Sequence, residues 1–324
     1  MIWSISSDKQ FKRCPHQWYY SNIVANAKVR KDPYRREVTI LSKLQTIEAW
    51  RGSVVDGIIS TSLVNALNKK FPIKKDYFLN KAMEVFDKQL EYAIFQKYRN
   101  TESGLSNDEG FAALLPYEFE EQIDDSTIVQ AREDVLTALT NLLDDHPFID
   151  YLKSAKYLVS QRTLIYPFDR FNVRAIPDLI AFFENDPPHI FDWKVHTYGN
   201  VSYDEQLIAY AAALYKVAHI KPHEDWPDIS KYRIFDYRLT EYQLLHKDRI
   251  KRDYEVTEYA LEEFSDRINA SIIEMYMCGC HKKYDQLTPD KFPSTKYFEN
   301  CPKCPFKKIC KSNNYETGDS YFSN

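Results

Sequence analysis

The segment Ile190-Phe191-Asp192-Trp193-Lys194-Val195-His196 alternates between polar and apolar residues, as a β-strand does when its two faces differ. Neighbouring side chains of a strand point to opposite faces, so Asp192, Lys194 and His196 are expected to share one face. The apolar side chains between them share the other face, which we expect to pack on a helix. The segment therefore predicts a carboxylate and an ammonium group together at one surface of a sheet.

A second aspartate precedes this strand, in the apolar run Ile176-Pro177-Asp178-Leu179-Ile180. An aspartate in such surroundings is costly to bury without a partner. If residues 171–184 pair antiparallel with residues 190–196, Asp178 can lie near Asp192. Two carboxylates beside Lys194 form a site of oxygen ligands suited to Mg2+ or Mn2+. The alternative without a function is an ordinary surface ion pair between Asp192 and Lys194.

Such a metal site favours the hydrolysis of a phosphodiester bond. A bound metal lowers the pKa of a water molecule and neutralises charge on the phosphoryl oxygens. A lysine beside it stabilises the attacking hydroxide or the transition state.

Three more polar residues are candidates for the same site. Gln206 and Tyr210 are four residues apart on an expected helix, so both project from one face and could hold a phosphate or orient Lys194. The alternative for Tyr210 is simple packing. Asp56 lies one turn after Gly52 in an apolar helix, where it is either a third metal ligand or a polar surface residue.

The end of the chain carries a C-x2-C-x5-C cluster formed by Cys301, Cys304 and Cys310. Three sulfurs this close together need a metal or an iron–sulfur cluster to neutralise them, and the plausible fourth thiolate is Cys14. The pattern predicts an inorganic clasp that joins the two ends of the chain. The alternative is a zinc ribbon that serves protein contact.

The composition is that of an ordinary globular protein, with 44% hydrophobic and 28% charged residues among 324, which argues against disorder. No apolar run approaches the roughly 18 residues of a membrane span, and the first residues lack the apolar core of a signal peptide. We therefore expect a cytoplasmic protein without a membrane partner, in which cysteines bind metal more often than they form disulfides. Cys278 and Cys280 do not belong to the cluster pattern. They either bind zinc together with His281 or are ordinary cysteines at the end of a helix.

The net charge of −4 excludes a surface that is basic all over, so a nucleic-acid partner requires a local positive stripe. Candidate stripes lie at residues 28–36 and 303–311. The chain has seven glycines and neither a dinucleotide-binding nor a P-loop motif, so we expect no nucleotide-driven motor.

Periodicity predicts a helical first half and a mixed second half. The expected helices are residues 40–67, 76–98, 127–143, 203–218 and 258–277, and the expected strands are 157–160, 164–168, 171–184, 190–196 and 232–239. The β segments between residues 156 and 196 are expected to form a three-stranded meander. We divide the chain into an N-terminal clasp segment with the first core helix (1–70), a helical insertion (71–150), a catalytic core (151–283) and a cysteine segment (284–324).

Taken in order, these motifs resemble those of a known family. Asp178, then Asp192-Trp193-Lys194, then Gln206-x-x-x-Tyr210, bracketed by Cys14 and the C-terminal cysteines, are similar to the PD-(D/E)XK nucleases of the RecB type. The likeness is to the iron–sulfur branch that includes the AddB nuclease domain and the CRISPR-adaptation exonucleases. It covers both termini and residues 156–220, but not the helical segment between about 70 and 150.

The resemblance implies a restriction-endonuclease-like α/β core, with a central mixed sheet flanked by helices. It implies a metal held by Asp178, Asp192 and the backbone carbonyl of Trp193, with Lys194 as the catalytic lysine. It also implies a [4Fe-4S] cluster on the four cysteines of the clasp. Many relatives carry Gly-x-x-x-His in the first core helix where this chain has Gly52 to Asp56, so Asp56 is expected to replace a histidine ligand.

The leading hypothesis is a metal-dependent DNA nuclease, exonuclease or endonuclease, that acts on single- or double-stranded DNA. The second hypothesis is a DNA-binding subunit with a vestigial active site, which grips DNA for a helicase or for another partner in a repair or defence complex. The intact set of Asp178, Asp192 and Lys194 favours the first, because a drifted site usually loses a ligand.

Overall fold

The computed structural model describes residues 2–26, 31–100, 109–196, 204–246 and 248–310. Of the predicted basic stripes, Lys28, Arg30 and Lys311 lie outside these residues. The chain forms two compact units. The first unit comprises Met1–Ile5, Ile47–Leu90 and Ile123–Ile272, and the second comprises Ser6–Thr46, Glu91–Gln122 and Ile273–Asn324.

The first unit is built on a five-stranded mixed sheet with the strand order β2-β5-β6-β7-β8. Its strands are β2 (Tyr157–Ser160), β5 (Leu179–Phe182), β6 (His189–Lys194), β7 (Arg238–Gln243) and β8 (Lys251–Tyr254). β5 and β6 are antiparallel, with Leu179 opposite Phe191, and β6 and β7 are parallel, with Asp192 opposite Glu241. The interior strands β5 and β6 are almost wholly buried, which agrees with the apolar residues that predominate in both.

A second, three-stranded mixed sheet has the order β1-β4-β3, formed by β1 (Ile2–Trp3), β3 (Leu164–Phe168) and β4 (Phe171–Ala175). The predicted single strand 171–184 is therefore wrong, because it divides into β4 and β5, which belong to different sheets. The division falls at Pro177, which has no backbone N–H for a sheet ladder. The predicted meander is accordingly replaced by two sheets.

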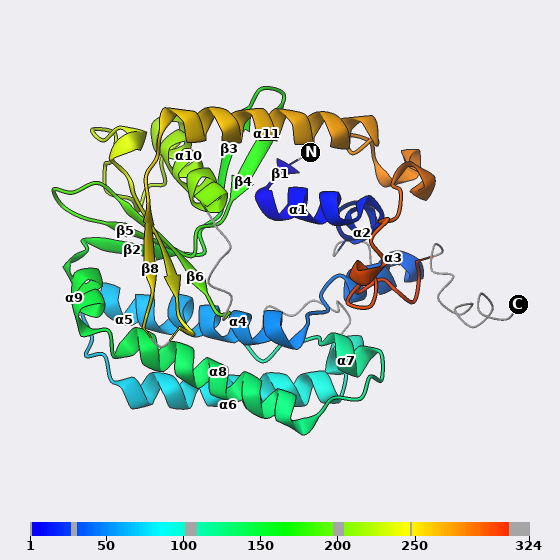
Figure 1. The fold of residues 1–324 in the computed structure, drawn as a ribbon, viewed down its shortest axis with the longest axis horizontal. Helices are drawn as coiled ribbons and strands as arrows, with labels where there is room; N and C mark the ends of the chain where they lie inside the picture. The colour runs from blue at the N-terminus through cyan, green and yellow to red at the C-terminus, as the bar shows by residue number, and fades with distance from the viewer. Residues whose placement is uncertain (1, 27–30, 101–108, 197–203, 247, 311–324) are drawn as a thin grey trace, which may run out of the picture. The chain divides into compact units, whose positions relative to one another are not determined.

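Helices flank these sheets, as Figure 1 shows. α10 (Asp204–Ile220) packs against β3, β4, β6 and β7. The other helices of this unit are α4 (Ile47–Ile58), α5 (Val64–Asn68), α8 (Asp125–Leu143), α9 (His146–Ser154) and most of α6 (Lys75–Ile94) and α11 (Glu258–Met277). A π-helical turn at Ile59–Leu63 joins α4 to α5. The α/β core expected from the sequence is confirmed.

α9 covers the apolar face of β6. The Phe148 ring packs edge-on against Phe191 and Trp193, with ring centroids 5.2 and 6.1 Å apart. Phe191 and Trp193 are stacked on one another along the strand, 5.8 Å apart and nearly parallel. The prediction of one apolar, helix-packed face and one polar face for this strand is therefore confirmed.

Most predicted helices are present, but two boundaries were wrong. The expected helix 40–67 is not continuous, because α3 (Pro33–Leu41) ends at Leu41. The backbone of Gln45 instead forms two β-type hydrogen bonds. Its N–H donates to the Ala113 carbonyl at 2.8 Å, and its carbonyl accepts from the Leu115 N–H at 2.9 Å. The expected strand 232–239 begins only at Arg238. A short 3-10 helix at Ile234–Asp236 precedes it, because the Asp236 carboxylate accepts hydrogen bonds from the backbone N–H and guanidinium of Arg233.

The second unit is helical. It contains α1 (Ile5–Arg13), α2 (Pro15–Tyr19), a π-helical turn at Tyr20–Val24, α3, α7 (Leu115–Glu118) and 3-10 turns at Lys97–Arg99, Tyr284–Gln286, Pro289–Lys291 and Phe298–Asn300. A salt-bridge network stabilises it internally, because the Arg99 guanidinium binds both Glu37 and Glu118. The four segments predicted from the sequence remain a proposal about domain organisation.

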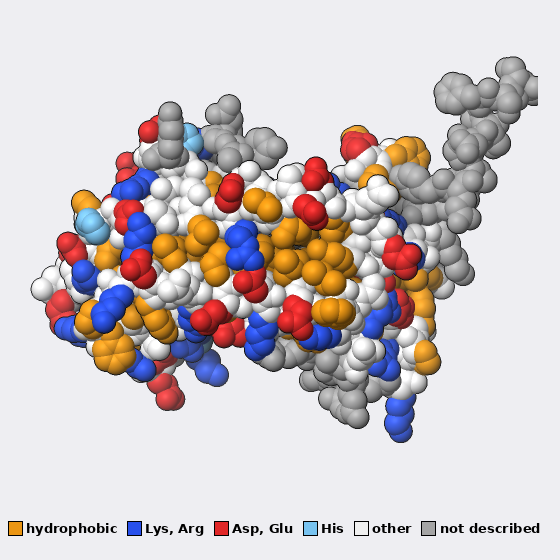
Figure 2. Space-filling model, turned by 90° about the horizontal axis from the view of Figure 1, so that it is seen from below, with side chains coloured by type: hydrophobic (Ala, Val, Ile, Leu, Met, Phe, Trp, Pro, Cys, Tyr) orange, Lys and Arg blue, Asp and Glu red, His pale blue; other side chains and the backbone are white. Residues whose placement is uncertain are grey.

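The side on which α6 and α8 lie shows hydrophobic side chains with basic and acidic groups interspersed among them (Figure 2). This mixture of charges is unlike the single-sign stripe that nucleic-acid backbones favour. Among the described residues, no helix has the length and apolarity needed to cross a bilayer.

Candidate active site

The structure brings three aspartates together in the first unit. Asp192 lies in β6 and is fully buried, Asp178 immediately precedes β5, and Asp56 lies on α4. The β5–β6 register places Asp178 across from Asp192. Asp178 is fixed by hydrogen bonds from the Trp193 backbone N–H to Oδ2 at 2.9 Å and from Gln161 Nε2 to Oδ1 at 3.0 Å.

Lys194 and Gln206 complete the polar face of β6. The Lys194 ammonium forms an ion pair with Asp192. The Gln206 side chain joins both groups, since its Nε2 donates to Asp192 Oδ1 at 3.0 Å and its Oε1 accepts from Lys194 Nζ at 3.4 Å. The same Nε2 lies 2.5 Å from the Tyr210 hydroxyl, so the two helix residues act together as expected from their four-residue spacing.

Crowding of negative charge dominates the electrostatics of this site. Burial is the largest cause that raises the pKa of Asp56, Asp178 and Asp192, which reaches about 7 for each of them. Neighbouring carboxylates add to the rise: Asp192 acts on Asp56, Asp56 acts on Asp178, and Asp178 acts on Asp192. Lys194 opposes the rise for all three acids but does not cancel it.

This donor set fits a divalent cation of the hard, oxygen-binding type. Three partly or fully buried carboxylates face one ammonium group, so a positive ion there would relieve both the repulsion and the cost of burial. Within the described residues, no three His, Cys, Asp or Glu side chains already have the spacing of a formed metal shell.

Two residues that position the site were missed from the sequence. Gln161, in the turn between β2 and β3, holds Asp178 by its side chain and the Pro177 carbonyl by its backbone N–H at 3.1 Å. Arg51, five residues before Asp56 on α4, donates to the Val195 carbonyl at 3.1 Å and forms an ion pair with Asp134. No local sequence pattern predicts that a glutamine in a turn or an arginine on a helix will contact residues this distant in the chain.

Two residues near the predicted site lie outside this group. β6 ends at Lys194, so His196 follows the strand instead of sharing its face. Glu205 forms an ion pair with Arg267 of α11, so it has a partner away from the aspartates.

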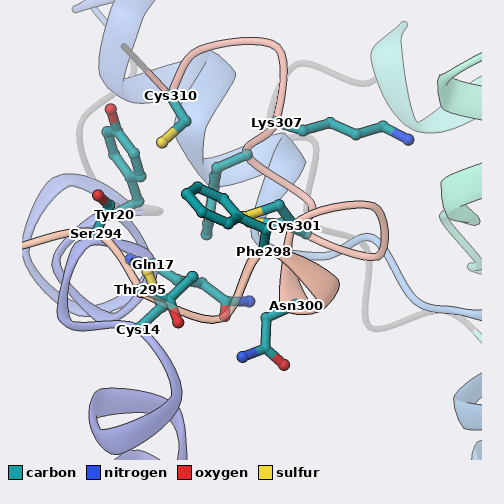
Figure 3. A pocket seen from close by; sticks show the side chains of 12 residues that line it. Cys14, Gln17, Tyr20, Ser294, Thr295, Phe298, Asn300, Cys301, Lys307 and Cys310 are labelled. Carbon is teal, nitrogen blue, oxygen red and sulfur yellow. Dashed lines mark hydrogen bonds between the residues drawn. The ribbon is translucent and has the colours of Figure 1, made fainter. Parts of the chain in front are cut away.

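In the second unit, all four predicted cluster cysteines line one small pocket. Figure 3 shows the sulfur atoms of Cys14, Cys301 and Cys310 turned toward the same space, with Tyr20 and Phe298 beside them. All six cysteines lie among the described residues, and none of them is in a disulfide there. Burial, together with the other three cysteines of the pocket, raises the pKa of Cys304 to about 12. Thiols crowded in this way fit a cation or cluster that would stabilise their thiolate forms.

Aromatic packing holds the N-terminal and C-terminal cysteine segments together. Phe292 stacks on Tyr19 with ring centroids 4.8 Å apart, and Phe306 lies 5.1 Å from Tyr20. The Tyr20 hydroxyl donates to the Ile309 carbonyl at 3.2 Å. Cys278 and Cys280 do not line the pocket.

Comparison with known proteins agrees with this geometry. A family model for the PD-(D/E)XK nuclease superfamily matches residues 2–311. A search of curated proteins finds no match to the chain. The family match spans both units and contains every aspartate, lysine and cysteine described above, and the chain accordingly belongs to the PD-(D/E)XK nuclease superfamily.

Proposed function

We propose that this protein is a metal-dependent deoxyribonuclease that hydrolyses phosphodiester bonds in DNA. Nucleases of the superfamily generally use Mg2+ or Mn2+. The observation that carries the proposal is the junction of β5 and β6, where Asp178, Asp192 and Lys194 meet on one side of the sheet. Acids from adjacent strands beside an amine are the groups that such a hydrolysis needs.

Asp178, Asp192 and the carbonyl of Trp193 would hold the metal, with Asp56 as an additional ligand from α4. When bound, the metal supplies an activated water and neutralises charge on the phosphoryl oxygens. Lys194 supplies positive charge at the reacting phosphate. Gln206 holds the Lys194 ammonium and the Asp192 carboxylate in one orientation, and Tyr210 in turn fixes the Gln206 amide.

We further propose a structural [4Fe-4S] cluster bound by Cys14, Cys301, Cys304 and Cys310, as in the RecB-type iron–sulfur branch of the superfamily. The pocket that these four side chains line supports this assignment. The remaining parts of the proposal are a cytoplasmic location and action beside a helicase or another partner in a repair or defence complex.

The alternative function is a catalytically weak subunit that binds DNA for such a partner. The two proposals differ in whether DNA is cut. Purified protein would be incubated with labelled single- and double-stranded DNA, linear and circular, with Mg2+, Mn2+ or EDTA. Metal-dependent cleavage that Lys194→Ala abolishes supports the nuclease, and loss of linear but not circular DNA would identify an exonuclease.

A matched control is Lys216→Ala, since Lys216 is exposed on the same helix as Gln206 and lies outside the site. Binding of DNA without cleavage under every metal condition would favour the DNA-binding subunit. Cleavage that persists undiminished in Lys194→Ala would refute the assignment of the site.

A further inference from the structure

A second concave site lies on the face of the five-stranded sheet opposite the aspartates. The pocket has a volume of about 640 Å3 and is lined by α9, β6, β7 and β8. His189 and Phe191 line it, and because side chains alternate along β6 they face away from Asp192 and Lys194. Its volume lies within the range of small-molecule sites, roughly 300–1,000 Å3.

The wall of this pocket is aromatic. Phe148 and Phe191 are buried with ring centroids 5.2 Å apart, and His189 stacks on Phe191 at 4.0 Å. Phe235 also lines the pocket, yet 47% of its surface is exposed. A large apolar ring left in water at the edge of a pocket offers a stacking surface for a flat ligand.

A chain of hydrogen bonds with a fixed direction forms the polar part of the pocket. The Thr240 hydroxyl donates to Asp253 Oδ1 at 2.5 Å, so its contact with His189 Nε2 at 2.7 Å requires that nitrogen to be the donor. His189 Nδ1 then accepts from the Tyr151 hydroxyl at 3.0 Å, and Tyr151 accepts from Arg238 at 3.5 Å. Burial lowers the pKa of His189 to about 3, consistent with a neutral ring that donates on one side and accepts on the other.

The charges that line the pocket leave an excess of acceptors. The Lys251 ammonium is paired with Asp145, and Arg238 lies 3.7 Å from Asp186, so both cations already have acidic partners. Asp253 Oδ2 accepts no hydrogen bond within the described part of the chain, and Glu255 forms no ion pair there. A ligand that enters is therefore favoured if the part that faces these carboxylates is flat and carries N–H donors, and disfavoured if that part is an anion.

We propose that this pocket binds a nucleobase that carries an exocyclic amine, as adenine, cytosine and guanine do. The ring would stack on Phe235, and the amine would donate to the carboxylates of Asp253 and Glu255. Carboxylates accept hydrogen bonds from such amines in base recognition. Because the chain belongs to a nuclease superfamily, the proposed DNA substrate itself contains nucleobases. Binding in this pocket requires neither the metal nor cleavage.

The test is isothermal titration of the full-length protein in EDTA with adenosine, cytidine, guanosine and uridine. We expect at least one amine-bearing nucleoside to bind with a Kd below about 1 mM, and uridine to bind more weakly than cytidine. Stacking is worth about 1–3 kcal/mol per base, so Phe235→Ala should weaken binding at least about fivefold. Glu255→Gln should also weaken it.

Two controls keep the interpretation clear. Phe71→Ala removes another exposed phenylalanine, 59% exposed, that does not line the pocket, and it should leave binding unchanged. Lys194→Ala should also leave nucleoside binding unchanged while abolishing cleavage, so failure of the nuclease proposal and failure of this one are separately visible. Absence of binding by every nucleoside, equal loss in Phe71→Ala, or binding of arginine amide in place of nucleosides would overturn the proposal.

The base could belong to a free nucleotide or to a DNA strand. A short cytosine-containing oligonucleotide distinguishes these sources, provided that its affinity is compared between the native protein and Phe235→Ala. A Phe235-dependent affinity greater than that of cytidine identifies a strand as the ligand, and an affinity equal to that of cytidine identifies the free nucleotide.

Discussion

The backbone N–H of Trp193 donates a 2.9 Å hydrogen bond to the Oδ2 atom of Asp178. This contact crosses from β6 to the residue that precedes β5, so it links the position of one acidic residue to the strand that carries the other. The separation of Asp178 and Asp192 is therefore set by the register of two buried antiparallel strands and does not depend on side-chain contacts alone.

Asp178→Asn tests this arrangement with little change in shape. The amide oxygen can still accept from the Trp193 N–H, so we expect the protein to fold normally. Loss of one anionic ligand should weaken Mg2+ binding and lower kcat by about 100- to 1,000-fold, the scale of losing one preorganised electrostatic group. Titration calorimetry with Mg2+ and single-turnover cleavage measure the two effects. Glu184→Gln, an exposed carboxylate in an ion pair with Lys156, is the control and should change neither.

Gln206→Ala should lower cleavage by a smaller factor. Its amide contacts Asp192, Lys194 and Tyr210 but is not itself a proposed metal ligand. Removing it frees the Lys194 ammonium to move, and we expect a roughly tenfold loss in kcat, equal to about 1.4 kcal/mol, with DNA affinity preserved. Tyr210→Phe should show a weaker loss because the Gln206 contacts to the strand remain. An equal drop in DNA affinity and kcat would indicate a binding role instead.

The metal-free protein should lose stability as pH rises through neutrality. The folded-state pKa of Asp56, Asp178 and Asp192 is raised from an ordinary value of 3.8 to about 7. The folded state therefore binds more protons than the unfolded chain between these values. The stabilising contribution is fully present below pH 3.8, declines through the interval and is lost above pH 7. Thermal unfolding in EDTA from pH 5 to pH 8 measures this decline.

Asp56→Asn separates this effect from general pH sensitivity. The variant removes one of the three crowded charges, so it should raise Tm in EDTA at pH 8 and have little effect at pH 5. Saturating Mg2+ should raise the Tm of the native protein at pH 8 and reduce the advantage of the variant, because metal binding relieves the same repulsion. A Tm of Asp56→Asn that is unchanged at pH 8 would show that Asp56 lies outside the charge cluster.

Much of this fold was predictable because its signals are local. The alternation in residues 190–196 gave the correct faces of β6, and the Gln206–Tyr210 spacing gave the correct face of α10. The acids met as expected because antiparallel pairing of neighbouring segments is the commonest way to connect strands in sequence.

The features that could not be predicted from the sequence are those that depend on contacts between residues distant in the chain. The single strand predicted over residues 171–184 ran through Pro177, and nothing local showed that the segments on either side of it enter different sheets. Gln161 and Arg51 acquire their roles from Asp178 and Val195, and these contacts exist only in the folded protein. The pocket beside His189 was likewise hidden, because its hydrogen-bond chain draws one residue from each of several elements.

The cysteine pocket gives a prediction that does not depend on catalysis. Protein purified under anaerobic conditions should be brown if a [4Fe-4S] cluster is bound, and colourless if the site holds zinc. Cys14→Ala and Cys304→Ala should each lose the colour and yield less soluble protein, because the cluster would close a loop spanning nearly the whole chain. By analogy with long disulfide loops, that closure is worth several kcal/mol, on the order of 4.

Cys278→Ala is the matched control, since this cysteine does not line the pocket, and it should keep both colour and yield. Equal colour and yield in Cys14→Ala, Cys304→Ala and the native protein would show that no metal centre joins the two segments, and the aromatic contacts to Phe292 and Phe306 would then be sufficient to hold them together.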